Sequence, residues 1–111
     1  MNSIDVCFSP ELIHFHEVKG KLVVVVDIFR ATSTMVAALA HGVTEIIPFA
    51  DLESCRAMQA QGYLIAGERD GLIAPGFELG NSPVAFVGGR YARQKLAMTT
   101  TNGTVAIEKS K

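Results

Sequence analysis

The run "KLVVVVDIFR" constrains the fold more than any other stretch of this sequence. Its four consecutive valines do not alternate with polar residues, a pattern typical of a strand covered on both faces, as in a parallel sheet. We therefore expect a buried strand at residues 22–26. The apolar residues 35–40 favour a helix, with Thr32, Ser33 and Thr34 as candidate N-caps.

Strand and helix patterns alternate along the rest of the chain. Alternation of this kind predicts an α/β fold with a mostly parallel sheet, in a Rossmann-like, three-layer α/β/α arrangement with helices on both faces. The length of 111 residues is natural for one domain, so we expect a single α/β domain over residues 1–111. Further strands are expected at residues 4–8, 44–50, 63–68 and 95–101, and further helices at residues 51–62, from residue 82 and from residue 102.

The composition excludes several classes of protein. A hydrophobic fraction of 49% suggests a well-buried core, and a net charge of −1 without a basic run argues against nucleic acid as the main partner. No apolar stretch is long enough to span a bilayer, and the first residues lack a signal-peptide pattern. Cys7 and Cys55 form no C-x-x-C pair, so we expect reduced core cysteines in a cytoplasmic protein.

Residues 27–34 form the predicted loop between the valine strand and its helix. Open parallel sheets gather such loops at the carboxyl ends of their strands, where ligands bind. A helix start and Arg30 both favour an anion, whereas Asp27 repels one unless a cation lies between them. The pair therefore suggests Mg²⁺ beside an anion. An equally weighted alternative is that Asp27 caps the loop and pairs with Arg30.

Two further loops follow apolar runs in the same way. Glu68, Arg69 and Asp70 come after "YLIAG", and residues 99–104 come after "KLAM". The second loop offers hydroxyl groups and a flexible glycine, which suit an oxyanion. Each loop also has an ordinary interpretation, a surface ion pair in the first and a capped turn in the second. Three such loops in one small domain favour a shared site.

Four motifs resemble those of a known family. "VVVVDIFRATST", "GERDG", "GFELGNSP" and "TTTNGT" occur in this order and resemble the N-terminal half of the 2-phosphosulfolactate phosphatase family. The chain departs from the usual motifs at Asp70, which replaces a glycine, and at Glu78, which replaces an aspartate. The resemblance implies Mg²⁺-dependent hydrolysis of 2-phosphosulfolactate to 3-sulfolactate and phosphate, a step towards coenzyme M. It also implies that the chain is half of a larger fold.

The resemblance assigns roles to individual residues. Asp27, Arg30 and Glu68 are the expected catalytic residues, with Asp27 and Glu68 as ligands of Mg²⁺. The nucleophile stays open between a metal-bound water and a covalent aspartate. Arg30 and Arg69 are expected to bind the phosphate and sulfonate of the substrate. The expected substrate-binding residues are Thr32, Ser33, Thr34, Arg69, Asn81, Ser82, Thr101, Asn102 and Thr104.

A second hypothesis is a non-catalytic domain that binds an anion, or an assembly fragment of a larger α/β protein. Under the first hypothesis the partner is a small anionic phosphorylated substrate, with neither nucleic acid nor membrane. A half-length domain also leaves a sheet edge and an apolar face uncovered. We therefore expect a homo-oligomer or association with the C-terminal half.

Overall fold

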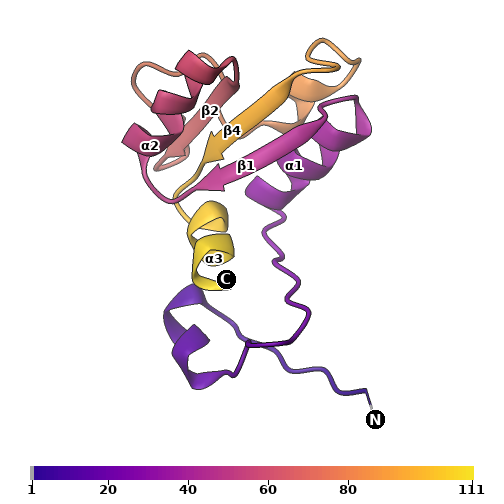
Figure 1. Cartoon of the computed structure of the whole chain (residues 1–111), viewed down its shortest axis with the longest axis vertical. Helices are drawn as coiled ribbons and strands as arrows, with labels where there is room; N and C mark the ends of the chain where they lie inside the picture. The colour runs from indigo at the N-terminus through magenta and orange to yellow at the C-terminus, as the bar shows by residue number, and fades with distance from the viewer. Residues whose placement is uncertain (1) are drawn as a thin grey trace.

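The computed structural model describes residues 2–111 and contains a four-stranded sheet of order β1-β4-β2-β3. Strands β1, β4 and β2 run parallel, and β3 pairs antiparallel with β2 (Figure 1). The predicted α/β fold with a mostly parallel sheet is therefore confirmed. The bounds of the strands are Glu45–Phe49 for β1, Leu64–Arg69 for β2, Leu72–Ile73 for β3 and Lys95–Thr99 for β4.

Helices cover both faces of this sheet. Along β4 the side chains alternate, so that Leu96 packs with Phe86 on one face and Ala97 packs with Cys55 on the other. The first cluster joins the sheet to α1 and η3, and the second joins it to α2. The helices are α1 (Ala31–Ala40), α2 (Leu52–Ala57) and α3 (Gly103–Lys109), and the 3₁₀ helices are η1 (Pro10–Phe15), η2 (Met58–Gln61) and η3 (Pro83–Phe86).

The residues at its two ends predict the position of the α2–η2 segment correctly. The Asp51 carboxylate accepts a hydrogen bond of 2.7 Å from the Ser54 backbone N–H, as an N-cap does. Gly62 ends η2 with a φ of +86°, a left-handed conformation that glycine adopts without strain. Pro48 lies in β1, which is an edge strand, where a missing N–H is tolerated.

The predicted caps of α1 are wrong. The helix begins at Ala31 with Arg30 as its N-cap, so Thr32, Ser33 and Thr34 lie inside the first turn. Their hydroxyl groups donate backwards to backbone carbonyls of the preceding loop instead of capping N–H groups ahead of them. These hydroxyl groups therefore stabilise the preceding loop and do not cap the helix.

Two predicted strands are also wrong. Residues 4–8 and 22–26 are extended but pair with no strand among the residues described, and Val24 and Val26 are 75% and 72% exposed. An unbroken apolar run signals a strand that needs a neighbour and a covering layer. Within residues 2–111, helices cover the faces of the sheet, and the valine segment does not pair with its edge strand β1.

The structure adds one strand and shortens another. β3 forms a tight hairpin with β2 at residues for which no strand was predicted, with Asp70 and Gly71 at φ values of +55° and +80°. The strand expected to reach residue 101 ends at Thr99. It ends there because Thr100 bonds to Thr104 and Thr101 bonds to Glu68, which turns the backbone out of the sheet.

Residues 2–30 form an arm that leaves the sheet and runs past α3 (Figure 1). With this arm the molecule measures 43 × 26 × 24 Å. No helix within residues 2–111 is long and apolar enough to cross a membrane. Large apolar side chains of the arm are strongly exposed, among them Ile4, Phe8, Leu22, Val24, Val26 and Phe29.

Candidate functional site

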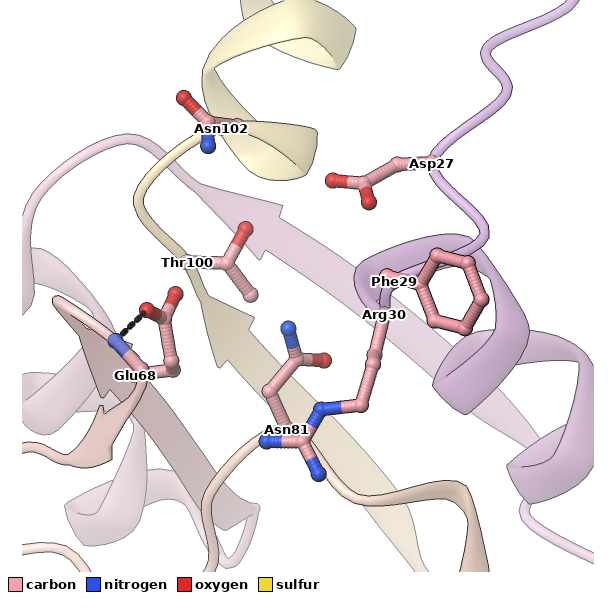
Figure 2. A pocket seen from close by; sticks show the side chains of 8 residues that line it. Asp27, Phe29, Arg30, Glu68, Asn81, Thr100 and Asn102 are labelled. Carbon is pink, nitrogen blue, oxygen red and sulfur yellow. Dashed lines mark hydrogen bonds between the residues drawn. The ribbon is translucent and has the colours of Figure 1, made fainter.

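A cavity of about 80 Å³ lies at the carboxyl ends of β2 and β4 (Figure 2). A cavity of this size suits a small ion with water and is far smaller than a site for a drug-sized ligand. Figure 2 shows Asp27 and Arg30 on one side of the cavity, Glu68 and Thr100 on the other, and Asn81 between them. The lining residues are Asp27, Phe29, Arg30, Glu68, Gly71, Asn81, Thr100 and Asn102.

Five of the sequence-predicted residues thus share one cavity, namely Asp27, Arg30, Glu68, Asn81 and Asn102. Sequence reasoning did not select Phe29, Gly71 or Thr100, although each lies inside one of the four motifs. Phe29 and Gly71 lack polar side chains, whereas Thr100 carries a hydroxyl group and was missed beside the predicted residues Thr101 and Asn102.

The loop that carries Asp27 is closed by Thr32. The Thr32 hydroxyl accepts from the Asp27 backbone N–H and donates to its carbonyl, both at 2.8 Å. The hydroxyl groups of Ser33 and Thr34 donate to other loop carbonyls at 2.7 and 2.8 Å. These three side chains shape the loop, and none of them lines the cavity.

Asp27 and Arg30 are not paired with each other. Within residues 2–111, neither the half-buried Asp27 carboxylate nor the exposed Arg30 guanidinium makes a side-chain hydrogen bond or ion pair. Both groups line the cavity. The interpretation of these residues as an internal structural pair therefore finds no support in the geometry.

Gly103 allows the start of α3 to approach Asp27 and α1. A Cβ atom at this position would lie 2.9 Å from Asp27 Oδ2 and 2.3 Å from Ala31 Cβ. No side chain fits at such distances, so the glycine is required for the observed packing. The loop of the "TTTNGT" motif is thereby held against the loop that carries Asp27.

Both oxygens of the Glu68 carboxylate accept hydrogen bonds. Oε1 accepts from the Thr101 N–H at 2.8 Å, and Oε2 accepts from the Gly71 N–H at 2.7 Å, the bond drawn in Figure 2. The Thr101 hydroxyl lies 3.0 and 2.9 Å from the two oxygens. Burial raises the pKa of Glu68, but the bonds from Thr101 and Gly71 outweigh it, so the pKa is lowered from its ordinary value.

Arg69 and Thr104 do not line the cavity. The Arg69 guanidinium donates to the carbonyls of Glu68 and Ala50 at 2.6 and 3.1 Å and to the Thr99 hydroxyl at 2.8 Å. Thr104 is fully buried and exchanges hydrogen bonds with Thr100 across the turn before α3. Both residues use their polar groups to join neighbouring elements.

A second, more apolar groove of about 290 Å³ adjoins the cavity. The two share Arg30, Glu68, Gly71 and Asn81, and the groove also contains Ser82. The predicted residue Ser82 is therefore near the cavity but outside it. The groove offers room beside the polar cavity for the remainder of a small ligand.

The oxygen atoms available as metal ligands around the cavity fit Mg²⁺ better than a transition metal. Within residues 2–111, no group of three or more His, Cys, Asp or Glu side chains gathers to hold a metal. The cavity offers instead one unpaired carboxylate, on Asp27, and the amides of Asn81 and Asn102. Mg²⁺ uses one or two carboxylates together with waters and substrate phosphate, so this set fits a magnesium ion that shares its coordination with a ligand.

Comparison with known proteins places the chain in a family. The family model described as 2-phosphosulpholactate phosphatase matches residues 7–111. A relative from Clostridium beijerinckii, named "Probable 2-phosphosulfolactate phosphatase", is 37% identical over 96% of this chain and 47% of its own length. Relatives of the same name from Pseudothermotoga lettingae and Parasynechococcus marenigrum are 42% and 47% identical, over 94% and 78% of this chain and 44% and 37% of their own lengths.

The chain therefore spans about half the length of the curated relatives it matches. The match covers all four motifs noted in the sequence, from the valine run to the threonine loop. These are also the segments that surround the cavity. On this evidence the chain belongs to the 2-phosphosulfolactate phosphatase family.

Proposed function

We propose that the full-length protein is a Mg²⁺-dependent phosphatase that hydrolyses 2-phosphosulfolactate to 3-sulfolactate and phosphate. The observation that carries this proposal is the unpaired Asp27 carboxylate and the unpaired Arg30 guanidinium in one small cavity. Family membership and the names of the relatives support the choice of phosphate ester.

Arg30 and Asp27 have different roles in the proposed binding of a phosphate ester. Arg30 offers a planar fork of donors that matches two phosphate oxygens, and it has no competing partner within residues 2–111. Asp27 is placed to hold Mg²⁺ with one oxygen or both. When bound, Mg²⁺ supplies positive charge against the phosphoryl oxygens and lowers the pKa of bound water.

The predicted roles of Glu68 and Arg69 stay predictions. The carboxylate of Glu68 could serve Mg²⁺ only by giving up hydrogen bonds to Thr101 or Gly71. Arg69 could reach a sulfonate only by leaving the carbonyls of Glu68 and Ala50. Arg30 is therefore our first choice for the anionic group of the substrate.

The experiment that tests this function is an assay of the full-length protein. We expect release of inorganic phosphate from 2-phosphosulfolactate, loss of that release with excess EDTA, and its return with added Mg²⁺. A panel of other phosphate monoesters serves as the control for substrate class. Phosphate release that is unchanged by EDTA would contradict the metal dependence, and no release from any ester would contradict the phosphatase assignment.

A second candidate function is a non-catalytic anion-binding domain, favoured by the partial coverage of the relatives. It predicts that phosphate binds to the 111-residue chain and to the full-length protein with equal affinity and without turnover. Calorimetry with inorganic phosphate on both forms separates this function from catalysis.

We also propose that the exposed arm is covered by the C-terminal half of the full-length protein. Unpaired backbone and exposed apolar side chains at residues 22–26 provide the surface. The relatives are long enough to supply the covering half.

The two free cysteines, Cys7 and Cys55, favour a cytoplasmic location for this protein.

A further inference from the structure

One buried polar atom beside the cavity has no hydrogen-bond partner. Asn81 is 7% exposed, and among the buried side-chain oxygen and nitrogen atoms of residues 2–111 its Oδ1 alone lacks a hydrogen bond. A buried acceptor without a donor costs free energy, and native proteins rarely retain one without a reason. Because Oδ1 is occluded, its partner must come from a side chain that already lies beside it.

That neighbouring side chain is Arg30. Figure 2 shows the Asn81 oxygen turned toward the Arg30 side chain and the amide nitrogen turned toward the cavity. The two residues line both the cavity and the adjoining groove. This orientation of the amide follows from the chemistry of arginine, because a guanidinium carries donors only and therefore attracts the acceptor end of an amide.

Both residues are fixed at the backbone, but the side chain of Arg30 is free. Asn81 follows Leu79, whose carbonyl accepts from the Gly67 N–H of β2 at 2.9 Å. The Arg30 carbonyl accepts from the Thr34 N–H and hydroxyl at 2.9 and 2.8 Å. Within residues 2–111 the exposed Arg30 guanidinium makes no hydrogen bond or ion pair. The long side chain can therefore rotate about a fixed Cα atom.

A neutral acceptor is well suited to direct an arginine that must bind an anion. A carboxylate beside Arg30 would also hold the guanidinium, but it would cancel the positive charge. An amide oxygen accepts from one N–H and leaves the charge and the other donors for the anion. Glu68, the buried acid of the cavity, accepts from Gly71 and Thr101 and so does not compete for Arg30.

We propose that Asn81 is the positioning residue of Arg30. When a phosphate group enters the cavity, the Arg30 guanidinium donates one N–H to Asn81 Oδ1 and its other donors to the phosphate oxygens. The amide nitrogen of Asn81 faces the same anion from the cavity wall. The bond to Oδ1 offsets the entropy lost when the long side chain becomes ordered. This inference rests on the proposed function for the presence of a phosphate group.

The test follows the guanidinium N–H signals of Arg30 by nuclear magnetic resonance in the full-length protein, labelled at arginine. Their absence in Arg30→Lys identifies them. In the wild type, inorganic phosphate with Mg²⁺ should shift these signals and slow their exchange with water. In Asn81→Leu, compared at equal phosphate occupancy, one protected N–H should be missing. Calorimetry should show phosphate affinity about tenfold lower or more, the worth of a hydrogen bond to a charged group.

Asn81→Asp separates the acceptor from the charge. Its carboxylate keeps an oxygen beside Arg30, so the N–H signals of Arg30 should be protected even without phosphate. Phosphate affinity should nevertheless fall, because the positive charge is cancelled and the amide donors are lost. Glu78→Gln is the matched control, because Glu78 is an exposed acid in the adjoining groove. This variant should keep the wild-type response of Arg30 to phosphate.

Thermal melting separates this role from a structural one. Because Asn81 Oδ1 makes no hydrogen bond within residues 2–111, Asn81→Leu should melt without phosphate at or above the wild-type temperature. The same variant should lose part of the rise in melting temperature that phosphate gives the wild type. A lower melting temperature without phosphate, with the full rise retained, would overturn the inference.

The other outcomes separate this inference from the proposed function. An unchanged Arg30 response in Asn81→Leu, or a lost response in Glu78→Gln, overturns the positioning role and leaves the phosphatase assignment standing. Unprotected Arg30 signals in Asn81→Asp do the same, even if Asn81→Leu fails to fold. A wild-type protein whose Arg30 signals ignore phosphate also overturns the inference. A wild type with the expected Arg30 response that releases no phosphate from any ester supports the inference and contradicts the phosphatase assignment.

Discussion

Glu68 and Thr101 lie 33 positions apart in the sequence and are joined by the Thr101 N–H, at 2.8 Å, and by the Thr101 hydroxyl, at 2.9–3.0 Å. This contact links the end of β2 to the loop that follows β4. The Thr101 hydroxyl also accepts from the Asp70 N–H at 3.2 Å, so the β2–β3 turn belongs to the same assembly. The link therefore joins two walls of the cavity that are far apart in the sequence.

Replacement of Glu68 tests the strength of this link. Glu68→Gln turns one acceptor oxygen into an amide donor, which leaves either the Gly71 or the Thr101 N–H without its acceptor. We expect the free energy of unfolding to fall by about 1–3 kcal/mol. Urea denaturation measures this loss, and Thr101→Val, which keeps the backbone bond, should cost less. Equal stability of Glu68→Gln and wild type would show that the carboxylate is not a structural group.

The same carboxylate predicts a pH dependence. Burial raises the pKa of Glu68, hydrogen bonds from Thr101 and Gly71 outweigh burial, and the net pKa lies below its ordinary value of 4.5. Because the pKa is lowered in the folded state, the stabilisation is complete above pH 4.5 and is lost as the pH falls through the lowered pKa. The difference in unfolding free energy between wild type and Glu68→Gln should therefore shrink below pH 4.5. A difference that grows on acidification would contradict this sign.

Gly103→Ala should disrupt the packing of α3 against α1. The new Cβ atom would lie 2.3 Å from Ala31 Cβ and 2.9 Å from Asp27 Oδ2, and one of these groups must move. We expect a loss of about 1–3 kcal/mol in stability, measured by thermal melting. Adding Ala31→Gly removes the closest contact, so the double variant should recover part of the loss. Additive losses in the double variant would rule out this clash as the cause.

Asp27→Asn and Arg30→Lys should affect different steps in the full-length protein. Asp27→Asn keeps the size and removes the charge that Mg²⁺ requires, so most Mg²⁺-dependent activity should be lost with little change in melting temperature. Arg30→Lys keeps the charge and loses the planar fork, so KM should rise by about tenfold while the Mg²⁺ dependence is retained. Assays across Mg²⁺ concentrations decide the first prediction, and unchanged Mg²⁺ activation in Asp27→Asn would defeat it.

The exposed arm predicts self-association of the 111-residue chain. Val24 and Val26 are 75% and 72% exposed on an unpaired extended segment, which favours pairing with another chain. Light scattering should show association that increases with concentration, and Val24→Lys with Val26→Lys should reduce it. Val36→Lys is the matched control, because Val36 is 67% exposed on α1 and has no unpaired strand backbone. A stable monomer at high concentration would contradict the prediction.

Much of the fold could be predicted from local patterns. Asp51 and Gly62 marked the two ends of the α2–η2 segment correctly, because capping and left-handed turns depend on the residue itself. The runs that became β2 and β4 were apolar on both faces, and both are indeed covered on both faces. Three loops that follow apolar runs predicted a shared site, and Asp27, Arg30 and Glu68 from these loops line one cavity, whereas Thr101 does not.

Only the tertiary structure decided which polar groups remain free at that cavity. Glu68 and Arg69 are adjacent in the sequence and equally suited to a site, yet both are engaged by distant backbone groups. The bonding state of Asn81 Oδ1 is likewise invisible in the sequence, because it depends on every neighbour that is near in space. The valine run at residues 22–26 also shows what the sequence alone could not determine. Its composition determined that it needs a covering partner, but pairing is a property of two segments, and within the described residues no second segment pairs with it.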